Sequence, residues 1–371
     1  MFMARALQLA ERGLYTTTPN PRVGCVIVKA GRIIGEGWHE KAGEAHAEAM
    51  ALRSSVGAAD TQLSVGADDT PSSAGATAYV SLEPCNHFGR TPPCSDALIA
   101  AGVKRVVAAI QDPNPLVAGQ GLAKLRAAGI TVECGLHEAE ARELNIGFVS
   151  RMTRGRPWVR VKVATSLDGK TALNNGVSQW ITGAAARRDA HHWRARSCAI
   201  LTGIGSVKHD NPRLTVRDVL TTRQPVRVVL DSHLETSPGA AVLEGGGALI
   251  FCAERNTGRQ SALEAAGAEV LVMPDSDGRI DLAAMLRELG RRGVNELLVE
   301  AGATLNGTML AANLVDEILI YQAPILIGDQ ARGMFDIGEI ARLGDAKRLQ
   351  ILERRVLGED SLIRGRLIAA S

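Results

Sequence analysis

The chain has 371 residues, 46% of them hydrophobic, which is enough for two domains that each bury a core. The formal net charge of +2 argues against an extensive nucleic-acid-binding face, which needs dense positive charge. No apolar run reaches the roughly 20 residues of a membrane span, and six scattered cysteines do not fit a small disulfide-rich secreted protein. These features predict a soluble cytoplasmic protein that binds neither membranes nor nucleic acids.

The first part of the chain alternates predicted helices and strands. An amphipathic helix over residues 3–14 ends before Pro19 and Pro21, because proline cannot continue a helix. The elements that follow are a hairpin at 23–35, a helix at 45–52, strands at 77–82, 103–110 and 130–133, and helices at 95–101, 116–128 and 138–145. Such alternation predicts a sheet layered with helices.

Residues 54–76 interrupt this pattern. They are mostly small, polar or glycine and show no periodicity, so we interpret them as a flexible surface insertion. Because closing a flexible loop of this length costs little extra entropy, we expect its deletion to be tolerated.

The chain then contains a motif typical of catalytic zinc sites: one imidazole, one carboxylate and two thiols, in this order. His46 and Glu48 stand on a predicted helix, Cys85 follows a strand, and Cys94 precedes a helix. Each is common as an ordinary core or surface residue, but together they predict zinc with three protein ligands and one position for water. The carboxylate is then free to move protons. Because residues two apart do not share a helix face, His46 and Glu48 converge only at a helix start.

The motif resembles the zinc site of the cytidine-deaminase fold, in which the cysteines are usually spaced Cys-x-x-Cys. Here eight residues separate Cys85 from Cys94. Residues 82–94 (Leu-Glu-Pro-Cys-Asn-His-Phe-Gly-Arg-Thr-Pro-Pro-Cys) instead resemble the deaminase half of the bifunctional riboflavin-biosynthesis deaminase–reductase family, as do residues 20–24 and 111–115.

This resemblance implies that His46, Cys85 and Cys94 hold zinc, while Glu48 moves a proton from the attacking water to the ring nitrogen and the leaving ammonia. It also implies a substrate pocket lined by Asn20, His39, His87, Arg90, Asp112 and Asn114. An ordinary turn role competes for Asn20 and Asn114, because Asn-Pro turns commonly use the asparagine for local hydrogen bonds.

The second half of the chain predicts another α/β domain. A polar, basic linker is expected at 149–157, so the domains are predicted at 1–148 and 156–371. Strands are expected at 158–165, 199–202, 225–230, 248–252, 270–273, 296–300, 318–327 and within 348–369, with helices at 184–196, 262–266 and 281–291. Two glycine-bearing strand-to-helix turns, at 203–205 and 302–308, suit phosphate binding, although ordinary turn glycines look the same.

Residues 163–170, 178–182, 210–217 and 299–303 resemble the reductase half of the same family, whose fold is similar to that of dihydrofolate reductase. The resemblance implies that NADPH lies near Ala164, Trp180, Ser206, Asp210, Ser232, Gly302, Ala303, Thr304, Leu305, Asn306, Gly307 and Thr308. It implies that the substrate meets Ser178, Arg194, Leu214, Arg217 and Glu300.

Two points of chemistry follow for this predicted reductase. Arg194 and Arg217 suit a ribose phosphate, because a guanidinium pairs with its oxygens, although a solvated surface role is common for arginine. The source of the proton that accompanies hydride transfer is open: Asp168, Glu300 and water are the candidates.

The predicted fold is therefore α/β, with an N-terminal cytidine-deaminase-like three-layer domain and a C-terminal dihydrofolate-reductase-like domain. The predicted enzyme deaminates 2,5-diamino-6-(5-phosphoribosylamino)pyrimidin-4(3H)-one with Zn²⁺. It then reduces the ribosyl group of 5-amino-6-(5-phosphoribosylamino)uracil to ribityl with NADPH, and is expected to form a homo-oligomer.

Two alternatives stay open. One is a nucleic-acid-editing zinc deaminase with a C-terminal binding module. The other is a structural zinc domain, with His87 as a fourth ligand, fused to a nucleotide-sensing module.

Overall fold

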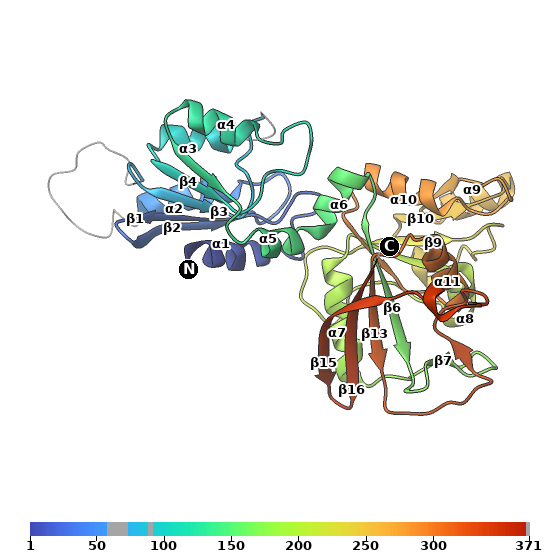
Figure 1. Ribbon diagram of the computed structural model, residues 1–371. Helices are drawn as coiled ribbons and strands as arrows, with labels where there is room; N and C mark the ends of the chain where they lie inside the picture. Colours follow the sequence, from blue (N-terminus) through green and yellow to red (C-terminus); the bar gives the residue numbers. More distant parts are fainter. Residues whose placement is uncertain (58–72, 88–91, 369–371) are drawn as a thin grey trace. The chain divides into compact units, whose positions relative to one another are not determined.

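The computed structural model describes residues 1–57, 73–87 and 92–368, and the chain divides into two compact units, Met1–Gly155 and Arg156–Ser371 (Figure 1). Most of the predicted insertion at 54–76 lies outside the described residues, but its ends belong to the fold. Residues 54–57 finish a helix and Ala76 is buried, so deletion of the whole segment would remove parts of the folded unit. The expected linker at 149–157 is mostly helical, because α6 spans Ile146–Arg154.

The N-terminal unit has a mixed sheet in the strand order β2-β1-β3-β4-β5. Its strands are β1 (Gly24–Lys29), β2 (Arg32–Trp38), β3 (Thr77–Val80), β4 (Arg105–Ala108) and β5 (Thr131–Cys134). Strand β1 pairs antiparallel with β2 and β3, whereas β3, β4 and β5 pair in parallel. The parallel strands place their carboxyl ends at one edge, where α/β proteins commonly build sites.

Helices cover both faces of this sheet (Figure 1). Helices α1 (Phe2–Glu11) and α5 (Glu138–Leu144) pack on one face, and α2 (Ala47–Gly57), α3 (Cys94–Ala100) and α4 (Gln120–Ala127) pack on the other. Alternate residues of β1 enter the two cores. Cys25 and Ile27 pack on the face covered by α2, α3 and α4, and Val26 and Val28 pack on the face covered by α1 and α5. A strand covered on both faces is apolar throughout, which explains the continuous hydrophobic run.

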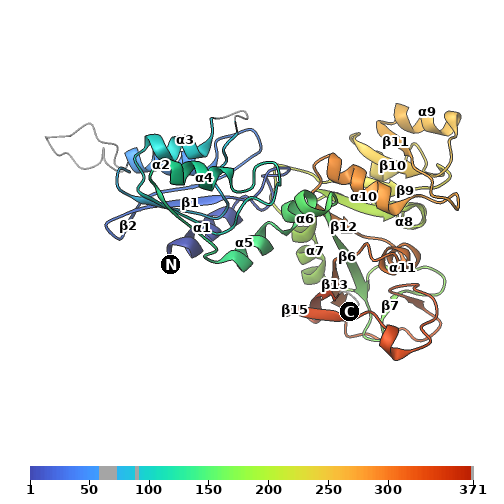
Figure 2. The same ribbon diagram turned by 45° about the horizontal axis from the view of Figure 1, so that its top comes forward.

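The C-terminal unit contains a larger sheet in the order β11-β10-β9-β8-β12-β6-β13-β16-β15 (Figure 2). Its strands are β6 (Trp158–Thr165), β8 (Ala199–Gly203), β9 (Val226–Leu230), β10 (Ala248–Cys252), β11 (Ala268–Val272), β12 (Glu296–Val299), β13 (Glu317–Gln322), β15 (Leu349–Leu357) and β16 (Asp360–Leu367). Strands from β11 to β13 in this order pair in parallel, and β16 and β15 follow antiparallel. A small ribbon joins β7 (Lys170–Ala172) to β14 (Arg332–Gly333).

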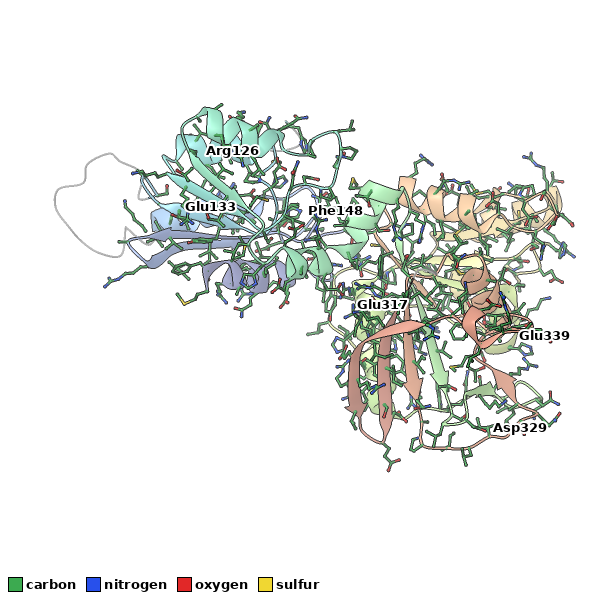
Figure 3. All side chains as sticks on the ribbon, viewed as in Figure 1. Arg126, Glu133, Phe148, Glu317, Asp329 and Glu339 are labelled. Atoms are coloured by element: carbon green, nitrogen blue, oxygen red, sulfur yellow. The ribbon has the colours of Figure 1, made fainter. Side chains whose placement is uncertain are left out.

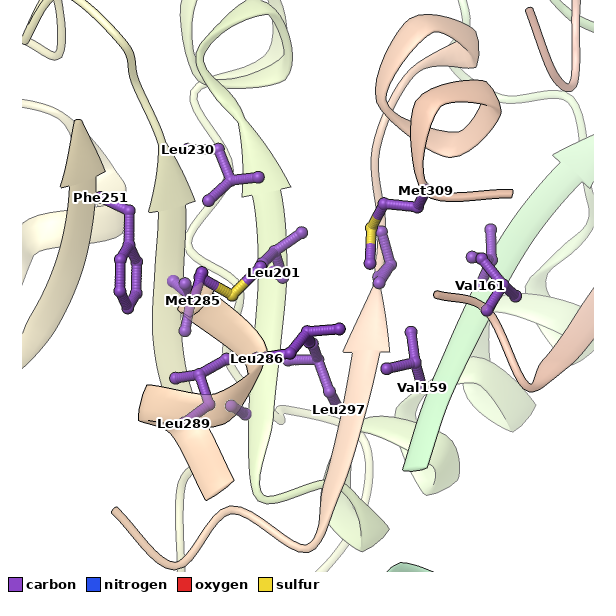
Figure 4. Close-up of a cluster of buried hydrophobic side chains, with 14 of the residues drawn as sticks. Val159, Val161, Leu201, Leu230, Phe251, Met285, Leu286, Leu289, Leu297 and Met309 are labelled. Atoms are coloured by element: carbon purple, nitrogen blue, oxygen red, sulfur yellow. The ribbon is translucent and has the colours of Figure 1, made fainter. Parts of the chain in front are cut away.

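The helices of this unit are α7 (Ala184–Arg196), α8 (Ile204–Asp210), α9 (Thr257–Ala265), α10 (Leu282–Arg291) and α11 (Ala303–Ala311). Side chains of α10 and α11, including Met285, Leu286, Leu289 and Met309, pack on one face of the sheet (Figure 4). The opposite face is covered by α7, α8 and α9. Within the described ranges, no helix has the length and apolarity needed to cross a membrane.

Three predicted boundaries were wrong for local reasons. Helix α9 begins at Thr257 rather than 262, because the Asn256 side chain caps it by accepting the Arg259 N–H at 3.0 Å. Helix α4 begins at Gln120 rather than 116, after a turn at Gly119 with φ of 79°. Strand β13 ends at Gln322 rather than 327, just before Pro324, which cannot donate to a ladder.

A buried ion network ties together four strands of the C-terminal unit. The Arg160 side chain is buried, donates from Nε to Glu317 Oε1 at 2.8 Å and also pairs with Glu296. Glu317, labelled in Figure 3, also accepts from Arg364 Nε at 2.7 Å. Arg196 of α7 donates to Glu296 at 2.7 Å. Because an unpaired buried charge is costly, each member depends on the others.

Replacing Arg160 should therefore destabilise the C-terminal unit. We expect Arg160→Met to lower its free energy of unfolding by about 3 kcal/mol, because Glu296 and Glu317 each lose a buried partner. Denaturant titration followed by tryptophan fluorescence measures this loss. Arg291→Met, which removes an exposed ion pair with Glu288 in the same unit, is the control and should cost less than about 1 kcal/mol. Equal effects of the two substitutions would contradict the assigned role of the network.

Candidate active sites

The four residues of the predicted zinc motif meet in the N-terminal unit. His46 directly precedes α2, Glu48 lies in the first turn of α2, Cys85 follows β3, and Cys94 is the first residue of α3. A Cβ atom on Gly37 of β2 would lie 2.4 Å from the carbonyl oxygen of Ala47. Glycine at this position therefore lets the start of α2 lie directly against the sheet and brings His46 to the ends of β3 and α3.

The ligand atoms are arranged as a metal site requires. His46 Nδ1 lies 3.5 Å from Cys85 Sγ and 3.3 Å from Cys94 Sγ, and the three ligand atoms all lie within 4.8 Å of one another. Around a tetrahedral zinc ion, nitrogen and sulfur ligands are separated by about 3.6 Å. The donor set of one imidazole and two thiols also matches the preference of zinc. The residues present therefore fit Zn²⁺, with Nδ1 as the histidine ligand.

The two cysteines are already electronically different. The backbone N–H of Cys94 donates to Cys85 Sγ at 3.3 Å. A hydrogen bond from the Cys94 thiol, together with His46, lowers the pKa of Cys85 to about 4 against the effect of burial. The same hydrogen bond raises the pKa of Cys94. The environment thus favours the thiolate at Cys85, and a bound cation would favour it at both cysteines.

Glu48 lies next to these ligands and is buried, with 3% of its surface exposed. Burial and the negative charge of Cys85 raise its pKa to about 7. His46 and Glu48 converge because the site lies at the start of α2, as the sequence required. A carboxyl group that exchanges its proton near neutral pH suits acid–base chemistry.

Asn20 and His39, both predicted to bind substrate, contact each other, and His39 also contacts the histidine ligand. Asn20 Nδ2 lies 3.0 Å from His39 Nε2, and His39 Nδ1 lies 3.1 Å from the carbonyl oxygen of Ala45. Since a carbonyl only accepts, Nδ1 carries the proton and Nε2 accepts from Asn20. The His39 ring packs edge-on against His46, with centroids 5.3 Å apart. His39 therefore also orients the chain that leads into the metal ligand.

Asp112 and Asn114 lie on the loop that follows β4. Asp112 is partly buried, and burial raises the pKa of its carboxyl, as do the charges of Glu83 and Cys85. Asp112 Oδ1 accepts the Asn114 N–H at 2.8 Å, and Asn114 Oδ1 accepts the Leu116 N–H at 3.1 Å. The side chain of Asn114 thus makes the local turn hydrogen bond that was the alternative to substrate binding. Arg90, a predicted pocket residue between Cys85 and Cys94, lies outside the described residues.

His87 is exposed and does not belong to the metal-binding group. In the described ranges, that group contains His46, Cys85 and Cys94 alone. The fourth protein ligand proposed for a closed structural zinc site is therefore absent from this group, and the donor set is that of an open catalytic site.

In the C-terminal unit, the carboxyl end of β12 carries an ion pair. Arg194 of α7 donates from Nε and Nη2 to the two carboxylate oxygens of Glu300 at 2.6 and 2.8 Å, and from Nη1 to the carbonyl oxygen of Thr215 at 3.0 Å. Although burial opposes it, the Arg194 charge lowers the pKa of Glu300 to about 2. The guanidinium fork expected to meet a phosphate is engaged with Glu300 instead, while Arg217 is exposed.

Lys162 of β6 is a site residue that the sequence did not single out. It lies close enough to Glu300 and Arg194 to feel both charges, and its Nζ is 5.9 Å from the centre of the Tyr321 ring. Burial lowers the pKa of Lys162, although Glu300 opposes the shift. The signal was its position on a strand that is covered on both faces, where a lysine cannot reach bulk solvent freely.

Asp168, one of the proposed proton donors, has a different role. Its carboxylate accepts hydrogen bonds from the Ser166 hydroxyl and from the N–H groups of Ile327 and Gly328, and these bonds lower its pKa to about 2. Asp168 therefore holds the loop after β13. The pKa values of Asp168 and Glu300 are both lowered, which favours the ionised form of each and disfavours either as the proton donor.

The predicted cofactor residues gather at the carboxyl ends of neighbouring parallel strands. Ser232 follows β9, Ser206 and Asp210 lie on α8 after β8, Gly302 to Leu305 begin α11 after β12, and Ala164 lies on β6. Such an edge is where open α/β sheets bind ligands. Trp180 is 70% exposed and stacks under Arg187, whose Cζ lies 4.7 Å from the ring centroid.

Three of the residues predicted to contact cofactor or substrate are buried: Asn306, Gly307 and Leu214. Asn306 is 1% exposed and donates to the carbonyl oxygen of Ala301, and Gly307 is buried against Asp336. Both lie on the inner face of α11, whereas Thr304 and Thr308 are exposed. The side chain of Leu214 is 2% exposed and packs in the core, so only its backbone can face a substrate. Ser178 is half-buried on the loop before α7.

Two family models match the chain. The cytidine and deoxycytidylate deaminase zinc-binding region matches residues 1–110, and the RibD C-terminal domain matches residues 157–363. The riboflavin biosynthesis protein RibD of Escherichia coli (strain K12) is 47% identical over an alignment of 371 positions. The alignment covers 97% of this chain and 96% of that protein.

Solved structures agree with these matches. RibD of Acinetobacter baumannii (form 1) is 43% identical with a TM-score of 0.88, covering 99% of this chain and 98% of that one. A Thermotoga maritima protein described as a diaminohydroxyphosphoribosylaminopyrimidine deaminase/5-amino-6-(5-phosphoribosylamino)uracil reductase is 34% identical with a TM-score of 0.84, again covering 99% and 98%. The predicted fold class, cytidine-deaminase-like followed by dihydrofolate-reductase-like, is confirmed.

Removal of a single thiol should empty the metal site. We expect the purified chain to bind one zinc ion, and Cys85→Ser to bind at least tenfold less, because a neutral hydroxyl replaces a thiolate ligand. Metal analysis after dialysis measures this. Cys134→Ser, at an exposed cysteine outside the group, is the control and should keep its zinc. Full zinc content in Cys85→Ser would show that the metal is held elsewhere.

Proposed function

The chain belongs to the RibD family of riboflavin biosynthesis proteins, and on this premise we propose how its residues carry out the two reactions of the family. It is a bifunctional enzyme, a zinc-dependent pyrimidine deaminase and an NADPH-dependent reductase. Residues 1–148 form the deaminase domain and residues 156–371 the reductase domain. The ranges of the two family models and the division of the chain at residue 155 support this assignment.

The proposed substrates rest on the description of the Thermotoga maritima relative, which names both activities. The deaminase substrate is 2,5-diamino-6-(5-phosphoribosylamino)pyrimidin-4(3H)-one, and the reductase substrate is the deaminated product, 5-amino-6-(5-phosphoribosylamino)uracil. The description of the Thermotoga maritima protein, which this chain matches over 99% of its length, supports both.

In the deaminase domain, His46, Cys85 and Cys94 hold the metal and Glu48 moves the protons. When bound there, zinc supplies an activated water for attack on the amino-bearing ring carbon. Glu48 takes one proton from the attacking water and delivers it to the ring nitrogen. It then carries the second proton, from the hydroxyl formed by the attack, to the amino group, which leaves as ammonia. The observation that carries this assignment is the meeting of a buried carboxyl with one imidazole and two thiols at the starts of two helices.

Asn20, His39, His87, Arg90, Asp112 and Asn114 are the proposed substrate contacts of this domain. Five of these six lie in the described residues, on four segments of the N-terminal unit: before β1, after β2, between β3 and α3, and between β4 and α4. The bond between Asn20 and His39, and the charge interaction of Asp112 with His87 and Cys85, support a common pocket for these residues.

In the reductase domain, NADPH supplies a hydride to C1′ of the ribosyl group. As the bond between C1′ and the ring oxygen breaks, that oxygen needs a proton. Lys162 is the proposed donor, because it lies beside Glu300 and burial lowers its pKa towards the range where proton transfer is efficient. Glu300, held by Arg194, remains ionised and is placed to accept hydrogen bonds from sugar hydroxyls.

NADPH binding is assigned to the edge formed by Ala164, Ser206, Asp210, Ser232 and the start of α11, with Trp180 at its rim. Ser178, Arg217 and the Arg194–Glu300 pair face the substrate. The convergence of these segments at the carboxyl ends of β6, β8, β9 and β12 supports this placement.

We also propose that the protein works in the cytoplasm on small phosphorylated pyrimidines. It is expected to form a homo-oligomer and not to bind nucleic acid. The net charge of +2 supports the last point. Self-association is favoured by the edge strand β15, which exposes Ile351 and Val356. A nucleic-acid-editing deaminase is not favoured, because the C-terminal half matches a reductase domain.

One coupled assay tests the whole proposal. The full chain is supplied with the diaminopyrimidinone ribosyl phosphate and NADPH, and release of ammonia and loss of NADPH are followed together. We expect ammonia first and NADPH oxidation after it. NADPH oxidation without ammonia would show that the N-terminal domain is not a deaminase of this substrate.

Substitution of Glu48 separates proton transfer from metal binding. We expect Glu48→Gln to keep its zinc but to release ammonia at least 10²-fold more slowly, because an amide cannot carry the proton. Its reductase activity on the deaminated substrate should be unchanged. Near-normal ammonia release by this variant would refute the role of Glu48.

Substitution of Lys162 tests the proton donor of the second reaction. We expect Lys162→Met to lower the rate of reduction by roughly 10²- to 10⁴-fold, while deamination stays normal. Lys347→Met, at an exposed lysine that bonds to Asn313, serves as the matched control. Reduction at the unaltered rate in Lys162→Met would assign the proton to water.

A further inference from the structure

Glu83 is a buried carboxylate that neither proposed reaction uses. It is 5% exposed and stands two residues before the metal ligand Cys85. Its oxygens accept four backbone N–H groups: Oε2 from Asp112 at 3.0 Å and Gly119 at 2.9 Å, and Oε1 from Gly121 at 2.9 Å and Leu122 at 3.2 Å. No cationic side chain pairs with Glu83 among the contacts of the described residues, so backbone donors carry the whole stabilisation of its charge.

Three of these donors belong to the start of α4. The first N–H groups of a helix have no partner inside the helix and need an acceptor from outside. Gly119, the N-cap residue, has no side chain to provide one. Glu83 supplies the acceptor from the end of β3, and its negative charge is favoured at the positive end of the helix dipole.

The fourth donor, Asp112, lies at the other end of the connecting loop. Residues 109–119 join β4 to α4 and carry Asp112 and Asn114, which are linked by the hydrogen bond from the Asn114 N–H to Asp112 Oδ1. One carboxylate therefore closes this loop at both ends and fixes how the two proposed substrate contacts emerge from it.

Close packing ties the same loop to the metal ligand. A Cβ atom on Gly121 would lie 2.0 Å from the carbonyl oxygen of Pro84 and 3.2 Å from Glu83 Oε1. The helix start thus contacts the backbone directly before Cys85. The spacing between Cys85 and the loop is consequently set by the segment 83–85 itself.

We propose that Glu83 is a positioning residue for substrate binding in the deaminase domain, holding the loop of Asp112 and Asn114 at a fixed place beside the metal ligand Cys85. This inference rests on the proposed substrate contacts of Asp112 and Asn114. Glu83 itself touches neither substrate nor metal and acts through the loop.

Glu83→Gln in the full chain is the direct test. Glutamine has the same size but only one acceptor oxygen, and its NH₂ group faces two N–H donors that it cannot satisfy. We expect the KM of deamination to rise on the order of tenfold or more, with kcat changed less than about threefold. Zinc content and the reductase rate should equal those of the wild type, because the ligands and the other domain are untouched.

A second variant disturbs the loop without changing the charge. Gly119→Ala places a side chain at φ of 79°, which only glycine adopts easily, and should raise KM in the same direction. Glu133→Gln, at an exposed carboxylate on β5 labelled in Figure 3 and paired with Arg105, is the control and should leave both constants unchanged. If Glu83→Gln does not fold, Gly119→Ala alone decides.

The outcomes are distinguishable. A higher KM with normal zinc in Glu83→Gln, or in Gly119→Ala if Glu83→Gln does not fold, supports the inference. Unchanged KM, or a fall in kcat that parallels loss of zinc, overturns it, the latter because Glu83 would then support the metal ligands. Failure of the wild type to release ammonia in the same assay would instead overturn the proposed function and leave no KM to compare.

Discussion

A buried charge must find donors or an opposite charge, and this requirement shapes both units of the chain. In the N-terminal unit, Glu83 is satisfied by four backbone N–H groups, so a carboxylate draws a loop and a helix start to the end of β3. In the C-terminal unit, Arg160 links β6, β12 and β13 through two glutamates. Both arrangements fix backbone positions far apart in sequence, which hydrophobic packing alone does with less directional precision.

The same requirement divides the roles of the ionisable groups at the reductase site. The Arg194 fork keeps Glu300 ionised, which makes it an acceptor and removes it as an acid. Lys162 lies near this pair. Burial lowers the pKa of its ammonium group towards neutral pH, although the charge of Glu300 opposes this shift. When the environment shifts the pKa values of two neighbouring groups, the shifts commonly indicate which group acts as acid and which remains ionised. Here they favour Lys162 as the proton donor and Glu300 as the acceptor of hydrogen bonds.

Much of the fold was predictable because its signals are local. Alternation in β6 and the prolines after α1 are read directly from neighbouring residues, and the zinc ligands stand in a short motif whose geometry the helix start completes. Lys162 was missed because its burial depends on strands and helices distant in sequence. The hydrogen-bond partners of Asp168 and Asn306 could not be predicted for the same reason: the loop after β13 supplies the N–H partners of Asp168, and the carbonyls of Ala301 and Met334 accept from Asn306.

The long spacing between the two cysteines has a structural explanation. Cys94 begins α3, its N–H donates to Cys85 Sγ, and the Ser95 N–H donates to the carbonyl oxygen of Cys85 at 3.1 Å. These bonds fix the two sulfurs through the start of α3, and the Ser95 hydroxyl adds a hydrogen bond to Asn86 Oδ1 at 3.1 Å. The metal site therefore tolerates a connection longer than Cys-x-x-Cys. A spacing that weakens the match to nucleic-acid deaminases thus leaves the arrangement of the three metal ligands intact.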